Sequence, residues 1–163
     1  MQVLPGTMER NKYLANRLRE VYLSGTWIAN TNYMHQLQQT DWQLALRKLG
    51  DHNSIAALTF HINYYLEGIL AVTRGEPLSI RDIYSFDMPE LQSEVDWQQR
   101  IATLQHNAET LAAKIDAMTD AELDAPFVKE QYGTWYRNLE GLIEHGYYHL
   151  GQIALIRKLL VAL

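Results

Sequence analysis

The sequence predicts an all-α fold, a four-helix bundle with one or two short extra helices. In four long segments the apolar residues recur at steps of three and four, as on one face of a helix. Glycine, proline and helix-capping residues separate these segments. Apart from a few residues near Phe127, no segment alternates apolar and polar residues as a strand does. Helices that each bury one face pack together as a bundle.

The first half of the chain contains two of the long segments. A helix is expected over residues 7–24, with Gly25 as its stop. After a connector, residues 34–49 predict a shorter helix. Residues 54–73 predict a long and heavily buried helix, with Asn53 as its N-cap.

The second half begins with a long connection. Residues 77–91 predict an ordered loop, because the segment is too apolar to be solvated along its whole length. Ser93 and Asp96 resemble a capping box for a helix reaching about residue 118, and Thr119 and Glu122 form another for a short helix. Thr134 is a candidate cap for a last helix that extends almost to residue 163. Long connections leave the topology open from the pattern alone.

Length and composition limit the function classes. The 163 residues suggest a single domain spanning 1–163, and the net charge of −5 without a basic cluster argues against nucleic acid as a partner. The chain has no cysteine, so it has neither disulfides nor thiolate ligands. Neither a signal peptide nor a run of about 18 apolar residues is present. We therefore expect a cytoplasmic protein without a membrane segment.

The strongest candidate site lies in the last predicted helix. His145 and His149 are four residues apart, so they lie on one face of the helix, and the apolar Leu142, Ile153 and Ile156 lie on or near that face. Buried imidazoles need partners for their ring nitrogens. A divalent metal would bind both rings at once, and this spacing is one at which a single helix offers two ligands.

A third histidine can join this pair. His61 lies on the apolar face of the helix at 54–73, whereas His35 and His106 lie at polar positions and His52 lies in a turn. Three neutral imidazoles without a fourth protein ligand leave an open coordination position, which is typical of catalytic sites. Imidazole suits zinc, nickel and iron alike, so the identity of the metal does not follow. The walls of such a site could come from Tyr64, Tyr65, Trp135 and the loop segment 80–86.

Two known metal-site patterns are excluded. A zincin needs Glu directly after its first His, where this chain has Gly146, and the chain contains no Glu-x-x-His pair of the ferritin-like di-iron type. Gly141, Gly146 and Gly151 also interrupt the last helix, each at a cost of about 0.5–1 kcal/mol relative to Ala. Such a conflict with helix propensity marks either close helix packing, the favoured interpretation, or function.

Several phrases of the sequence resemble the DinB-like (YfiT-like) metalloenzyme superfamily. The most specific is Tyr148-His149-x-Gly151-Gln152-Ile153 with a helical His upstream. Asn53-Ser-Ile-Ala, Phe60-His-Ile, Tyr-Ser-Phe-Asp87, Asp96-Trp97 and Tyr132-Gly-Thr resemble one subgroup of that superfamily. The resemblance covers nearly the whole chain.

The resemblance implies an up-down-down-up bundle with a three-His metal site, often in a homodimer. The ligand roles fall on His61, His145 and His149, and the cofactor is a divalent zinc, nickel or iron ion. Relatives include S-transferases that use low-molecular-weight thiols and a mycothiol-dependent isomerase. This implies a metal-dependent thiol S-transferase or a hydrolase that acts on a small-molecule substrate, with such a thiol as a candidate second cofactor. The alternative is a non-catalytic helical module that binds metal or dimerises.

Overall fold

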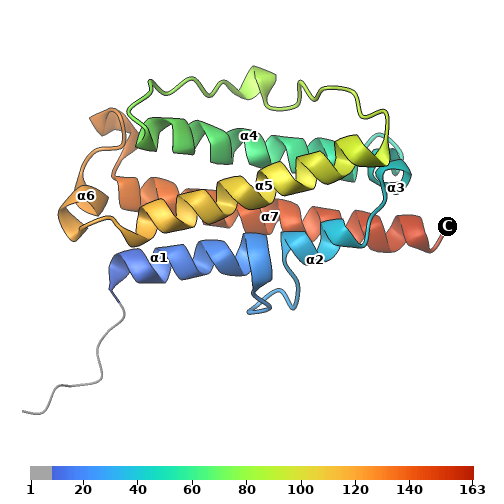
Figure 1. Cartoon of the computed structure of the whole chain (residues 1–163), viewed down its shortest axis with the longest axis horizontal. Coiled ribbons are helices and arrows are strands. Elements are labelled where there is room, and N and C mark those ends of the chain that lie inside the picture. Colours follow the sequence, from blue (N-terminus) through green and yellow to red (C-terminus); the bar gives the residue numbers. More distant parts are fainter. Residues whose placement is uncertain (1–8) are drawn as a thin grey trace, which may run out of the picture.

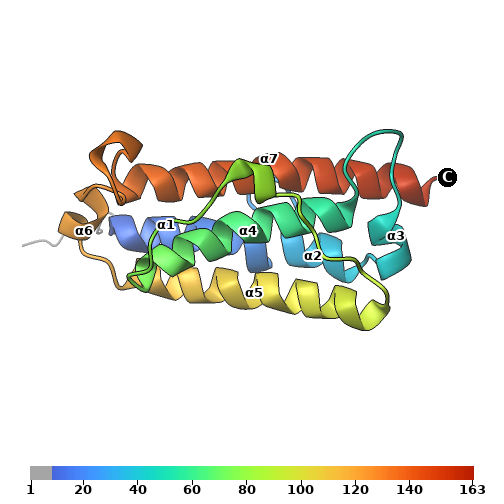
Figure 2. The same ribbon diagram turned by 90° about the horizontal axis from the view of Figure 1, so that it is seen from above.

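The computed structural model describes residues 9–163, and its long helices run side by side in a bundle (Figures 1 and 2). The long arms are α1 (Arg10–Arg19) with its π-helical extension η1 (Glu20–Ser24), α4 (Ile55–Thr73), α5 (Glu94–Asp116) and α7 (Trp135–Val161). Helices α1 and α7 run in one direction, and α4 and α5 run in the other. This is the up-down-down-up topology that the family resemblance implied.

The first arm differs in detail from the predicted helix at 7–24. Thr7 and Met8 lie outside the described residues, and α1 changes to π-helical geometry at Glu20. The arm ends at Ser24, as expected, but Gly25 has an extended backbone rather than the left-handed conformation of a usual helix stop.

The single helix predicted over 34–49 is wrong, because two short helices stand there, α2 (Tyr33–Gln38) and α3 (Trp42–Leu46). Between them, the Thr40 carbonyl accepts a hydrogen bond of 2.6 Å from the buried indole of Trp97 on α5. The Asp41 side chain then caps α3 by accepting from the Leu44 amide at 2.7 Å. A tertiary hydrogen bond and a local cap thus interrupt the helix that periodicity suggested.

Helix α4 is the most apolar arm, and its expected cap is displaced by one residue. The Ser54 hydroxyl, not Asn53, accepts from the amide of the first turn. By length and composition α4 alone, within residues 9–163, could cross a membrane. However, 61% of its most apolar window is buried inside the bundle, as in the core helix of a soluble protein.

The connection from α4 to α5 crosses the outside of the bundle, passing over α4 (Figure 2). As predicted, it is ordered, and it contains a short 3-10 turn, η2 (Asp82–Tyr84). Ser93 caps α5 as expected. The Asp96 carboxylate accepts from the Gln92 amide at 2.9 Å, one residue before the position in a regular capping box.

The connection from α5 to α7 contains α6 (Asp120–Asp124) and a 3-10 turn, η3 (Glu130–Tyr132). The capping box of Thr119 and Glu122 is formed as predicted, and Thr134 caps α7 by accepting from the Arg137 amide. Near Phe127, where the sequence hinted at a strand, the described chain forms an isolated bridge between Pro126 and Thr134. The bridge brings the start of α7 back to the end of α6.

Candidate metal centre

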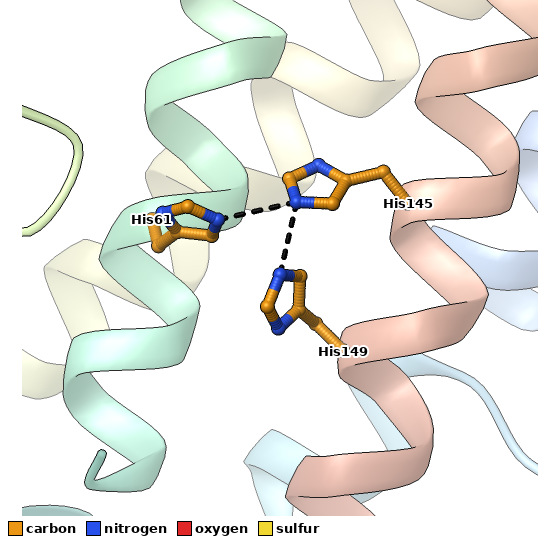
Figure 3. Close-up of side chains that lie close together, drawn as sticks. All are labelled: His61, His145 and His149. Carbon is orange, nitrogen blue, oxygen red and sulfur yellow. Dashed lines mark hydrogen bonds between the residues drawn. The ribbon is translucent and has the colours of Figure 1, made fainter. Parts of the chain in front are cut away.

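The three predicted histidines meet between two neighbouring helices of the bundle. His61 extends from α4, and His145 and His149 extend from successive turns of α7 (Figure 3). The Nε2 atom of His145 lies 3.2 Å from Nε2 of His61 and 2.9 Å from Nε2 of His149. His61 and His149 are buried, and His145 is partly buried. Among the described residues, these three histidines form the group of three potential metal ligands whose ligand atoms lie close together.

The geometry of the three rings fits a metal ion. A ring nitrogen has one in-plane position, which holds either a hydrogen or a lone pair. Nε2 of His145 therefore cannot form good hydrogen bonds with both neighbours at once. A tetrahedral metal with metal–nitrogen bonds of about 2.0–2.1 Å separates its ligand nitrogens by about 3.3 Å. The two separations from His145 are somewhat shorter than that value, and the three candidate ligand atoms all lie within 4.8 Å of one another, which suits one shared ion.

Neighbouring side chains orient two of these rings. Nδ1 of His149 donates to the amide oxygen of Gln152 at 2.6 Å, which leaves the lone pair of His149 on Nε2. The ring of His61 stacks on Phe86 of the α4–α5 connection, with centroids 4.1 Å apart and an interplanar angle of 11°. Nδ1 of His61 is buried, and no hydrogen bond of regular geometry reaches it from the described residues, although the Ser85 main chain lies near enough to raise the pKa of the ring. Its orientation therefore depends on packing more than on a hydrogen bond.

A tyrosine closes the site on the side of the same connection. The edge of Tyr65 packs against His61 and His145 with centroid distances of 5.0 Å each. Its hydroxyl donates to Asp82 at 2.7 Å. Burial, together with this carboxylate, raises the pKa of Tyr65 to about 12, so Tyr65 remains a neutral phenol that holds Asp82 beside the histidines.

The electrostatic environment keeps the histidines neutral, as metal ligands must be. Burial lowers the pKa of all three, and their mutual repulsion adds to this for His61 and His145. The pKa of His145, at the centre of the cluster, falls to about 4. The Ser85 main chain and the Asp82 carboxylate act in the opposite direction on His61.

The three glycines of α7 have different surroundings. A Cβ on Gly146 would lie 2.8 Å from the hydroxyl oxygen of Tyr22. This glycine therefore permits close packing of the first arm against α7, which is the interpretation that the sequence favoured. Gly141 lines a cavity, whereas Gly151 is exposed and a Cβ there would contact nothing. Close packing therefore explains one of the three.

The structure separates the remaining candidates. His35, His52 and His106 are exposed, as expected for residues outside the site. The assignment of Trp135 to the wall of the site is wrong, because its ring packs against Phe127 and borders a separate cavity beside α5. Tyr64 bonds the main chain of Arg81 and so anchors the connection rather than contacting the histidines.

Asp82 and Ser85 lie in the segment 80–86, which the sequence analysis placed at the wall of the site without naming either residue. They lie more than twenty positions from His61 along the chain and reach it because the connection folds back over α4. The apolar character of the segment predicted its place at the wall, but no local signal distinguished these two polar residues from their neighbours. Gln152 belonged to the recognised phrase, but its contact with His149 emerges only from the structure.

A cavity of about 570 Å³ adjoins the cluster, and His145 forms part of its wall. The wall is mainly apolar, with side chains from α4, from α7 and from both long connections. The other lining residues are Tyr65, Ile69, Leu78, Ile80, Phe127, Tyr132, Arg137, Asn138, Gly141 and Leu142. A volume of this size suits a small molecule.

Comparison with known proteins agrees with this architecture. The sequence profile of the DinB superfamily matches residues 22–153, which include all three histidines. Searches of curated proteins and of solved structures gave no significant match. Because the profile covers most of the chain, this protein belongs to the DinB superfamily.

Proposed function

We propose that this protein is a divalent-metal-dependent enzyme whose metal ligands are His61, His145 and His149. The observation that supports this most directly is the convergence of three Nε2 atoms, at 2.9 and 3.2 Å, beside a cavity for a small molecule. Their lowered pKa values and the bond from His149 to Gln152 suit neutral ligands with directed lone pairs.

In the proposed reaction a low-molecular-weight thiol loses its proton to solvent and its sulfur forms a bond to a carbon of a small electrophile, whose leaving group departs with the electron pair of the broken bond. His61, His145 and His149 would hold the divalent metal with one coordination position open, where it would lower the pKa of a bound thiol or water. The chain has no cysteine, so the thiol must come from a small molecule. The chain's own contribution is to orient the imidazoles and to exclude water with Phe86, Tyr65 and the apolar cavity wall.

Metal analysis tests the proposed site. Wild-type protein is stripped with a chelator, offered zinc, nickel or ferrous iron in turn, desalted and measured by elemental analysis. We expect about one equivalent of a preferred metal per chain. The variant His149→Ala should retain little of it, because two imidazoles bind far more weakly than three. His106→Ala, which changes an exposed histidine of α5, is the matched control and should retain the wild-type amount. Near-zero metal in the wild type would refute the proposed site.

An activity screen distinguishes an enzyme from a non-catalytic metal-binding module. Metal-loaded protein is mixed with small thiols and a chromogenic electrophile, and the His149→Ala variant gives the background rate. Turnover that depends on the metal and on His149 supports the enzyme. If the metal raises the melting temperature but accelerates no thiol transfer, the metal-binding module is the better description.

A further inference from the structure

A cation and a bare helix surface precede His145 along α7. Arg137, Gly141 and His145 are four residues apart, so they lie in one row on the helix, and the row spans about 12 Å. All three line the cavity of about 570 Å³. An Nη atom of Arg137 would be 3.9 Å from a Cβ placed on Gly141, so the guanidinium reaches along the helix toward His145.

Gly141 keeps this row open. A Cβ at that position would meet no heavy atom nearer than the Arg137 guanidinium, so packing does not require a glycine there. The residue nevertheless costs the helix about 1 kcal/mol relative to Ala. A bare backbone between the cation and the histidine lets a ligand lie directly against α7.

The guanidinium of Arg137 can exchange its present ionic partner for a ligand. Of the described residues that line the cavity, Arg137 alone is a permanent cation. Its present partner is Glu144, at 3.1 Å, and both side chains are more than half exposed. Such a pair contributes little to stability, so a ligand carboxylate can replace Glu144 as the partner.

We propose that the cavity binds a small molecule with an apolar body and one terminal carboxylate. Arg137 binds the carboxylate, the apolar body lies over Gly141 between α4 and α7, and the opposite end faces His145. The proposal depends on the proposed function for the chemistry at the histidine end, but the recognition of the carboxylate does not require the metal.

Matched probes test the proposal by calorimetric titration of zinc-loaded protein. Mercaptohexanoate and mercaptohexanol share a thiol and a chain, and they differ in the carboxylate. We expect wild-type protein to bind mercaptohexanoate about ten-fold more tightly, as for one charge-assisted hydrogen-bonded pair. The variant Arg137→Met keeps an apolar stem and should bind the two probes equally.

Two further variants separate recognition from structure. Glu144→Gln removes the competing carboxylate, so its preference for mercaptohexanoate should equal or exceed that of the wild type. If Arg137 acted only as the partner of Glu144, both variants would behave alike. In Gly141→Leu the new side chain suits the helix but fills the space between Arg137 and His145. The variant should bind both probes more weakly, while its circular dichroism spectrum remains that of the wild type. A preference that survives Arg137→Met, or undetectable binding of both probes, would overturn the proposal.

A separate measurement distinguishes failure of the proposed metal site from failure of the proposed carboxylate site. If wild-type protein takes up no zinc, the proposed function fails. The comparison then uses hexanoate and hexanol with metal-free protein, monitored by ligand-observed NMR. Metal-free wild-type protein should prefer hexanoate to hexanol, and Arg137→Met should lose this preference. Absence of the preference in the wild type would refute the carboxylate site independently of the metal site.

Discussion

The contacts around each imidazole of the cluster are different in kind. His149 is oriented by a hydrogen bond to Gln152, His61 by a stacked Phe86, and His145 by the edge of Tyr65 and by the other two histidines. A directed hydrogen bond sets the tautomer, which ring packing does not. The position that most directly controls the lone pair of a ligand is therefore Gln152.

Removing the amide of Gln152 should weaken metal binding without disrupting the bundle. In Gln152→Leu, Nδ1 of His149 loses its acceptor, and metal affinity should fall about 10–100-fold. Competition with a chromogenic chelator measures the change. Gln152→Glu keeps an acceptor at this place and should retain at least wild-type affinity. Equal affinity in the wild type and the leucine variant would mean that Gln152 does not orient the ligand.

At the scale of elements, charged groups join α1 to the end of α5 and to α6. Asp116, the last residue of α5, pairs with Arg19 and with Lys12, the latter at 3.4 Å. Arg10 pairs with Asp124 at 2.7 Å. The hydrogen bond from Arg19 is the main cause of the lowered pKa of Asp116. These contacts hold α1, the shortest of the long arms, in register with α5.

The contribution of the Asp116 ion pairs to the free energy of unfolding should depend on pH. Because its pKa is lower in the folded state than in the unfolded chain, the stabilisation is present above about pH 4 and is lost as the pH falls through the folded pKa. Asp116→Asn should lower the free energy of unfolding by about 0.5–1 kcal/mol at pH 7. The difference from the wild type should shrink as the pH falls below about 4 and disappear once Asp116 is protonated in the folded state as well. Urea unfolding across this range measures it, with exposed Asp51→Asn as the control. A difference that persists at low pH would contradict the ion-pair explanation.

At the scale of the whole molecule, the C-terminal part of α7 leaves an apolar face uncovered. Leu155 is 58% exposed and Leu159, one turn further, is 42% exposed. The exposed Val161 and Leu163 extend this apolar surface to the end of the chain. We propose that it pairs with the same face of a second copy in a homodimer, because a two-fold contact covers both faces at once.

Light scattering tests the dimer. The wild-type protein should have the mass of two chains, and the double variant Leu155→Glu, Leu159→Glu should have the mass of one. Val95→Glu changes a residue of α5 that is 77% exposed, and it should leave the dimer intact. A monomeric wild type, or a dimeric double variant, would exclude this face as the interface.

The all-α class, the four long arms and the inward-facing histidines could be predicted from the sequence. Helical periodicity and the caps Ser93, Thr119 and Thr134 are local properties, because they depend on residues within a few positions of each other. The spacing of His145 and His149 is local for the same reason. The topology followed from the family resemblance and not from the helical pattern.

Only the tertiary structure decided which distant groups complete the site. The break between α2 and α3 depends on Trp97 of α5, and the surroundings of His61 depend on Asp82, Ser85 and Phe86. The row from Arg137 to His145 could be inferred from α7, but the cavity beside it requires α4 and both connections. Sequence patterns report which face a helix buries. Which residues meet on that face depends on how the helices pack, and that is a property of the whole chain.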